Sequence, residues 1–358
     1  MKLLPLLGCV ICLSLQAQNS DSIQKHFSFG GYIETYYTYD FNKPRNHERP
    51  SFLYNHIRHN EVNVNLALLR ANYETDRVKV NLGLMAGTYP QYNLAGEQAM
   101  LRNIYEANVD YKLTKKQELW LEAGVFTSHI GAESAIGKDC WTLTRSIMAE
   151  NSPYYLSGAR LHYTTKNQKW YAGLSYLNGW QRIQRAPGNS TPCFGTQLTY
   201  KPNKNFSFNS STFIGNDKPD TVKQMRYFHN FYAIMQFSKR IGVIVDVELG
   251  MEQKSKNSSD YNKWYAPGII VRYSASGKID IAGRYEYFND SKGVLIPTGT
   301  PNNFQVSNYS LNVDYKPTAN MMFRIEGRYF ESLDDIFIRN AKATYNDFCL
   351  AASIAAWF

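Results

Sequence analysis

The C-terminal stretch Phe348-Cys349-Leu350-Ala351-Ala352-Ser353-Ile354-Ala355-Ala356-Trp357-Phe358 has a strict period of two. Successive side chains of a strand point to opposite faces. One face therefore carries Phe348, Leu350, Ala352, Ile354, Ala356 and Phe358, and the other carries Cys349, Ala351, Ser353, Ala355 and Trp357. Chain termini commonly fray in polar residues, whereas this one is apolar and ends on an aromatic ring. The stretch predicts a terminal strand with one wholly apolar face.

The N-terminus has the pattern of a secretory signal peptide. Lys2 is the only charge before Asp21, and the apolar run from Leu3 to Leu15 is too short to span a bilayer as a helix. We predict cleavage after Ala17, which gives a signal peptide over 1–17 and a second region over 18–358. The stretch Leu6-Leu7-Gly8-Cys9 also matches a lipoprotein box, but too few apolar residues precede Cys9 for a normal hydrophobic region.

Composition favours a membrane-spanning β-barrel. No apolar stretch of about eighteen residues follows the signal peptide, so any insertion into a bilayer must use strands. The chain has 27 Tyr, 19 Phe and 6 Trp, as expected for interfacial aromatic girdles. Lys and Arg outnumber Asp and Glu by 39 to 30 but form no dense run, which argues against nucleic acid. A cationic lumen, or attraction to anionic surface lipids and sugars, accounts for the excess.

Alternating segments recur along the whole chain and predict sixteen strands. The predicted ranges are 27–39, 58–74, 77–89, 102–113, 117–128, 153–165, 168–180, 193–201, 204–215, 225–238, 241–254, 262–275, 278–289, 304–316, 320–331 and 343–358. Their connections alternate between short turns and long polar segments, the latter at 40–57, 90–101, 129–152, 181–192, 216–224, 255–261, 290–303 and 332–342. This alternation is typical of a transmembrane antiparallel up-and-down barrel with short periplasmic turns and long extracellular loops.

The period of two also assigns the faces of each strand. We expect the apolar face to contact lipid and the charged face to line a wetted lumen, which sixteen strands are enough to enclose. The last strand then places Phe358 against lipid at the periplasmic rim. The predicted lumen-lining residues are Arg160, Arg272, Arg284, Arg324, Arg328, Glu106, Glu122, Asp246, Glu248, Glu286 and Glu326.

The longest connection, 129–152, is the candidate constriction of the channel. Trp141, Leu143, Ile147 and Met148 are too apolar for a loop exposed to water, so we expect it to fold into the barrel. The alternative is an outward surface loop with solvated charges. The spacing of its apolar residues predicts a short helix over about 141–149, before Pro153. The predicted constriction residues are Glu133, Lys138, Asp139, Arg145 and Glu150, which would set the electrostatic barrier.

Motifs for metal, disulfide or catalytic chemistry are weak. Three cysteines follow the signal peptide, and we favour unpaired thiols, while a bond between Cys140 and Cys193 stays open. His56 and His59 point to opposite faces if they lie on a strand, which argues against joint metal binding. No nucleophile elbow or phosphate-binding loop is present, so we predict neither a cofactor nor an enzyme.

Several ordered motifs carry a family resemblance. They are Gly31-Tyr32-Ile33-Glu34-Thr35-Tyr36-Tyr37, the stretch from Asn55 to Ala67 (NHIRHNEVNVNLA), Lys138-Asp139-Cys140-Trp141, Thr144-Arg145-Ser146, and Ser152 to Gly158 (SPYYLSG). Together they resemble the β-barrel porin family described as OmpL-like, of Gram-negative outer membranes. The terminal strand likewise resembles the one that closes such barrels and is read by their assembly machinery, which implies a role of Phe358 in membrane insertion and assembly. The resemblance implies an outer-membrane barrel with porin activity, and it transfers no catalytic residue.

We therefore expect an outer-membrane porin, a passive diffusion channel for small hydrophilic solutes. The competing interpretation is a plugged or narrow barrel that acts as a surface binding, adhesion or scaffold protein, because eight long loops also suit recognition. Expected partners are outer-membrane lipid and lipopolysaccharide, the barrel assembly machinery and small hydrophilic solutes, with no nucleic acid. The sequence leaves the oligomeric state open.

Overall fold

A computed structural model describes residues 26–358, so the predicted signal peptide lies outside the described part of the chain. These residues form a closed barrel of antiparallel strands. The barrel strands are β1 (Phe27–Asp40), β2 (Val62–Glu74), β3 (Val78–Ala86), β4 (Ile104–Lys112), β5 (Glu118–Thr127), β6 (Tyr155–Thr164), β7 (Trp170–Leu177), β8 (Cys193–Asn203), β9 (Phe206–Gly215), β10 (Arg226–Gln236), β11 (Ile241–Gln253), β12 (Tyr261–Ser274), β13 (Ile279–Asp290), β14 (Phe304–Thr318), β15 (Met321–Ser332) and β18 (Asn346–Trp357). The predicted count of sixteen is confirmed. Within this part of the chain, no helix is long and apolar enough to cross a membrane.

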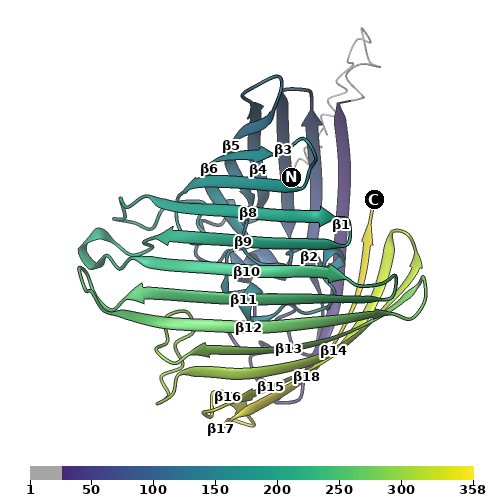
Figure 1. Cartoon of the computed structure of the whole chain (residues 1–358). Coiled ribbons are helices and arrows are strands. Elements are labelled where there is room, and N and C mark those ends of the chain that lie inside the picture. The colour runs from purple at the N-terminus through teal and green to yellow at the C-terminus, as the bar shows by residue number, and fades with distance from the viewer. Residues whose placement is uncertain (1–25) are drawn as a thin grey trace, which may run out of the picture.

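The chain closes its sheet by joining its first and last strands. Each strand pairs with the next in sequence, and β1 pairs with β18, from Tyr32 opposite Trp357 to Asp40 opposite Cys349 (Figure 1). Gly31 and Phe358 exchange two backbone hydrogen bonds of 3.1 Å. The Phe358 ring lies over Gly31, whose missing Cβ leaves space for it. Closure removes the unpaired strand edges that a bilayer does not tolerate.

The two faces of the strands differ as the period of two predicts. In β18, Phe348, Leu350 and Ile354 are exposed on the outer face, while Cys349 and Ala351 are fully buried. Phe358 is 81% exposed, consistent with a lipid-facing rim position. Apolar side chains on the outer face can contact lipid without burying a polar group. Charged side chains on the inner face can pair with other polar groups in the lumen.

The connections differ in length from one end of the barrel to the other. The turns at 75–77, 113–117, 165–169, 204–205, 237–240, 275–278 and 319–320 are short, and the opposite end carries the eight long loops. The last loop contains a hairpin, β16 (Phe337–Arg339) with β17 (Lys342–Thr344), that we did not predict. The prediction that the second strand begins at 58 was wrong by four residues, because Arg58 forms an isolated bridge with Glu48 inside the first long loop.

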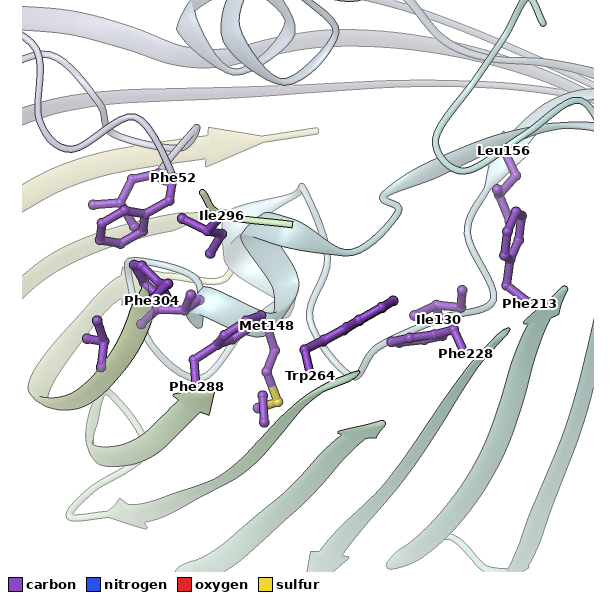
Figure 2. Close-up of a cluster of buried hydrophobic side chains, with 14 of the residues drawn as sticks. Phe52, Ile130, Met148, Leu156, Phe213, Phe228, Trp264, Phe288, Ile296 and Phe304 are labelled. Carbon is purple, nitrogen blue, oxygen red and sulfur yellow. The ribbon is translucent and has the colours of Figure 1, made fainter. Parts of the chain in front are cut away.

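The long-loop end of the lumen holds a hydrophobic cluster. The expected lumen, lined by charged residues and wetted throughout, does not account for it. Figure 2 shows part of this cluster, with Met148 near Phe288 and Trp264. Its loop members are Phe52, Leu53, Ile130, Ile147, Met148 and Ile296, and its strand members include Phe126, Phe213, Phe228, Trp264, Phe288, Phe304 and Phe330. The long loops therefore fold into the barrel and bury apolar lumen-facing rings.

The predicted helix over 141–149 was misplaced. The structure has a 3-10 turn at Gly137–Asp139 and a short helix, α3, at Ile147–Asn151. Ser146 caps α3 by accepting a hydrogen bond of 3.0 Å from the amide of Ala149. Ser146 has a non-helical backbone conformation and marks the N-terminus of α3, and the amides of Leu143 and Thr144 before it donate to wall side chains.

The three described cysteines are free and buried. The disulfide between Cys140 and Cys193 that the sequence left open does not form. The Cys140 thiol instead donates to the backbone oxygen of Ser134 at 3.3 Å, within the connection between β5 and β6.

Candidate functional site

The connection 128–154, here called the inward loop, runs along the inside of the barrel wall. Near its start, the imidazole of His129 forms a hydrogen bond of 2.9 Å with the backbone oxygen of Thr212 on β9. The amide of Gly131 donates to Asn230 on β10 at 3.1 Å. The amide of Ala132 donates to Asp246 on β11 at 3.3 Å. Three adjacent strands thus anchor the first part of the loop, and the expected inward fold is observed.

Acidic and amide side chains further along the wall, on β13 to β15, hold the middle of the inward loop. The amide of Leu143 donates to Asn312 on β14 at 3.1 Å, and that of Thr144 donates to Glu326 on β15 at 2.5 Å. The amide of Ile147 donates to Glu286 on β13 at 2.7 Å. These amides have no strand partner, and burial without an acceptor would cost about 1–3 kcal/mol each.

Three arginines of the same wall bind carbonyl oxygens of the inward loop. Arg284 donates to Thr144 at 2.7 Å, Arg324 to Gly137 at 2.8 Å and Arg328 to Arg145 at 2.8 Å. Each is buried and also pairs with a wall carboxylate: Arg284 with Glu326 at 3.1 Å, Arg324 with Asp314 at 2.7 Å and Arg328 with Glu286 at 3.0 Å. Paired charges of this kind fix geometry, and removal of one partner is strongly destabilising.

The side chains of two predicted constriction residues, Glu133 and Arg145, form hydrogen bonds with the backbone of the inward loop itself. Arg145 is fully buried and donates to the carbonyl oxygens of Ser134 at 2.6 Å and Ala135 at 3.3 Å. The Glu133 carboxylate accepts a 3.0 Å hydrogen bond from the amide of Ser146. Both side chains therefore support the loop's own fold.

A third predicted constriction residue, Glu150, joins two loops. Its carboxylate accepts from the amide of Tyr54 at 3.0 Å and from the side chain of Asn55 at 3.2 Å, in the first long loop. Burial raises the pKa of Glu150 to about 7, although these donors and nearby Arg145 and Arg328 act in the opposite direction. The group therefore titrates close to neutral pH.

The other two predicted constriction residues, Lys138 and Asp139, are accessible. Their side chains are 30% and 47% exposed and form an ion pair of 2.8 Å. The Lys138 ammonium also lies 5.6 Å from the centroid of the Trp357 ring. Among the predicted constriction residues, Lys138 and Asp139 are therefore the two whose charges are accessible to solvent.

The eleven predicted lumen-lining residues all lie on wall strands, and many contact the inward loop or each other. Arg272 stacks on Trp141 of the loop, with its guanidinium carbon 4.1 Å from the ring centroid. Glu122 pairs with Arg160 at 2.7 Å, and Glu106 pairs with Arg70, which we did not predict, at 2.6 Å. Glu248 is buried, and both of its carboxylate oxygens lack a hydrogen-bond partner among residues 26–358.

A cavity of about 1200 Å³ lies at the short-turn end of the barrel, on the β3–β10 side. Its lysine and acidic lining residues are Lys79, Lys116, Glu118, Lys166, Lys169, Lys201 and Lys204, and His162 also lines it. Sequence reasoning assigned the lumen charges from strand alternation alone and so missed these lysines. The available signal was the recurrence of lysine at the short turns, because neighbouring turns of a barrel lie side by side.

One group of side chains has the chemistry of a metal site. Asp110 on β4, Glu122 on β5 and His162 on β6 place one ligand atom each within 4.8 Å of the others. Carboxylate and imidazole ligands suit a divalent transition metal. The same acids already face cations, however: Glu122 pairs with Arg160, and Lys79 lies opposite Asp110 in the sheet register. The group therefore also works as a charge-balanced ladder across the strands.

Comparison with known proteins matches most of the chain to one family. The family described as “Putative beta-barrel porin-2, OmpL-like” matches residues 26–358. No curated protein matches the sequence.

Solved structures share the fold at low identity. An anion-selective porin from Comamonas acidovorans has a TM-score of 0.60 and 10% identity, covering 93% of this chain and 99% of that chain. The outer-membrane channel DcaP of Acinetobacter baumannii has a TM-score of 0.60 and 11% identity, with coverage of 93% and 97%. OmpF of Salmonella typhi has a TM-score of 0.57 and 12% identity, with coverage of 93% and 97%. This likeness supports the barrel fold.

Proposed function

Because the chain belongs to the OmpL-like β-barrel porin-2 family of the outer membrane, we propose that it is a passive diffusion channel for small hydrophilic solutes. The observation that carries this proposal is the sorting of side chains in a closed sixteen-strand barrel. Apolar side chains occupy the outer face, and the inner face carries charged and amide groups beside a cavity of about 1200 Å³. A barrel of this size has room for an aqueous path.

The inward loop is the element that we assign to the constriction. It lies inside the barrel against one continuous arc of the wall, from β9 to β15, and so narrows the path through the barrel on that side. Solute selectivity then depends on the remaining radius and on accessible charges such as Lys138 and Asp139. Glu133, Arg145 and Glu150 contribute by holding the loop in place.

A second function is favoured by the hydrophobic cluster at the long-loop end. Inward-folded loops that pack Phe52, Ile147 and Met148 against lumen-facing rings leave little space there. A barrel closed in this way would serve surface binding, adhesion or scaffolding, with its long loops as the contact surface. The two functions differ in whether ions cross the folded protein.

Single-channel recording in planar bilayers separates these functions. We expect discrete, stable conductance steps from protein whose folding is verified by its heat-modifiable electrophoretic mobility. Folded protein that gives no steps over a wide voltage range would overturn the channel and favour the binding function.

The remaining assignments follow from the same proposal. We propose that the terminal strand with Phe358 is read by the barrel assembly machinery and that the outer rim contacts lipopolysaccharide. We also propose that the protein works as a channel and not as an enzyme. Lipid or peptide turnover by purified protein, abolished by one Ser or His substitution, would contradict the latter.

A further inference from the structure

We propose that the cavity at the short-turn end is a binding vestibule for anionic oligosaccharides, on the periplasmic side of the constriction. The inference rests on the proposed channel function for its physiological meaning, but the binding site itself can be tested separately. The cavity combines an excess of positive charge, an aromatic and polar lining and a volume that fits several sugars.

The first observation is an excess of positive charge without counter-charge. Six lysines line the cavity, against a single acidic residue, Glu118. Lys79 pairs with Glu74 at 2.7 Å. Among residues 26–358, no carboxylate lies within 4.0 Å of the ammonium groups of the other five, which are Lys116, Lys166, Lys169, Lys201 and Lys204. A concave wall lined by one sign of charge concentrates counter-ions, so this cavity attracts anions.

The one acidic group of the cavity is already neutralised. The Glu118 carboxylate forms an ion pair with Lys112 and accepts a hydrogen bond of 3.0 Å from the indole of Trp120. It is therefore poorly placed to offset the five lysines. Lysine presents a compact charge on a flexible stem, which suits several separated anionic groups more than one planar carboxylate.

The second observation is the aromatic and neutral polar lining between the lysines. Tyr171 and Tyr232 contribute half-buried rings, and Gln197, Thr199, Asn205 and Ser207 contribute amide and hydroxyl groups. Trp120 also lies in this wall, but it is 6% exposed and the ammonium groups of Lys79 and Lys112 lie 4.8 and 5.5 Å from its ring centroid, so it supports the wall and leaves stacking to the two tyrosines. Sugar rings stack on such aromatic faces, and their hydroxyls bond to amides. Inorganic anions use neither feature.

The size of the cavity fits a chain of several sugars. Its volume of about 1200 Å³ exceeds the roughly 300–1,000 Å³ typical of sites for single small ligands. Its lysines come from the ends of β3 and β8 and from the turns at 113–117, 165–169 and 204–205, and are therefore spread along the rim. We therefore expect several uronate-type carboxylates to be bound at once. The competing source of anions is the headgroups of the surrounding leaflet.

The test is block of ion current by an oligogalacturonate of five residues, with the neutral maltopentaose as reference. The variant replaces Lys116, Lys166 and Lys201 by Gln. Its matched control replaces Lys43, Lys292 and Lys342, at the long-loop end, and so removes the same charge. We expect the anionic sugar to block the wild type and the control from the short-turn side. The dissociation constant for block should rise about tenfold in the vestibule variant, given the modest strength of each exposed pair, and wild-type affinity should fall with added salt.

Each other outcome contradicts the inference. Equal block by both sugars, or no loss of block in the vestibule variant, would remove the anionic saccharide as the ligand. Block that changes with the phosphatidylglycerol content of the bilayer and not with the lysines would attribute the effect to the charge of the lipid headgroups and remove the lysines from the site. Should the protein not conduct, calorimetric titration of the folded protein in detergent with both sugars still tests the site, so loss of the channel function and loss of the vestibule are distinguishable.

Discussion

At the scale of the residue, the main lesson concerns buried charge. Strand alternation predicted which face Arg284, Glu286 and Glu326 occupy, because facing depends only on sequence spacing. It could not predict that these side chains bind the backbone of the inward loop, because their partners lie about 140–180 positions away in the sequence. The charged residues that we predicted to line a wetted lumen mostly hold the inward loop by hydrogen bonds and ion pairs in the structure.

Arg145 shows the consequence for function. An Arg145→Met substitution leaves the carbonyl oxygens of Leu143 and Ala135 without a donor, at a cost of about 1–3 kcal/mol for each buried group. The carbonyl oxygen of Ser134 keeps only the weak Cys140 thiol donor. We expect a loosened inward loop, with larger and noisier single-channel conductance and faster proteolysis within 128–154. Because Arg145 is fully buried, the change in conductance should exceed any change in ion selectivity. The control is Lys138→Met, which removes a charge that is 30% exposed. Equal behaviour of both variants would show that Arg145 does not support the loop.

Glu150 predicts a dependence on pH. Its pKa rises from the ordinary value of 4.5 to about 7 in the folded loop, so the docked loop holds the proton more tightly than a released loop. Docking is therefore strongest below about pH 4.5, weakens as the pH rises towards 7, and is constant above that range. Conductance should increase between pH 5 and pH 8, and Glu150→Gln should abolish most of this change. Asp260→Asn, at an exposed loop position, serves as the control. The same pH profile in Glu150→Gln would exclude this carboxyl group as the cause.

At the scale of the element, strands were predictable and loops were only partly so. Each strand has a pattern that depends on its own residues, which is why all sixteen were found with small errors at the ends. The inward loop was recognisable because Leu143, Ile147 and Met148 are too apolar for water. Its helix was misplaced because Ser146 caps α3 and sets its start, while the residues before Ser146 follow acceptors on β14 and β15. No local signal reports such distant acceptors.

The packing of α3 yields a prediction for the loop as an element. Met148 is 3% exposed and belongs to the same cluster as Trp264 and Phe288. Met148→Asp places an unpaired carboxylate in this cluster, which is strongly unfavourable. We expect α3 to leave the cluster, conductance to rise, and the barrel to keep its heat-modifiable mobility. Met148→Leu conserves volume and should cost less than about 1.5 kcal/mol. If both variants conduct like the wild type, the cluster does not hold the inward loop.

At the scale of the whole molecule, barrel closure depends on the last residues of the chain, as the terminal alternation predicts. The contribution of the Phe358 backbone to closure can be measured separately from that of its side chain. Phe358 exchanges two backbone hydrogen bonds with Gly31, while its ring is largely exposed on the outer face. Phe358→Ala keeps both bonds, whereas deletion of Phe358 removes them at about 1 kcal/mol each. In detergent refolding we expect Phe358→Ala to resemble the wild type and the deletion to melt at lower temperature. In cells, where assembly is catalysed, both should accumulate less folded barrel. If Phe358→Ala melts like the deletion in detergent, the ring itself contributes to closure, and its role in assembly cannot be separated from barrel stability.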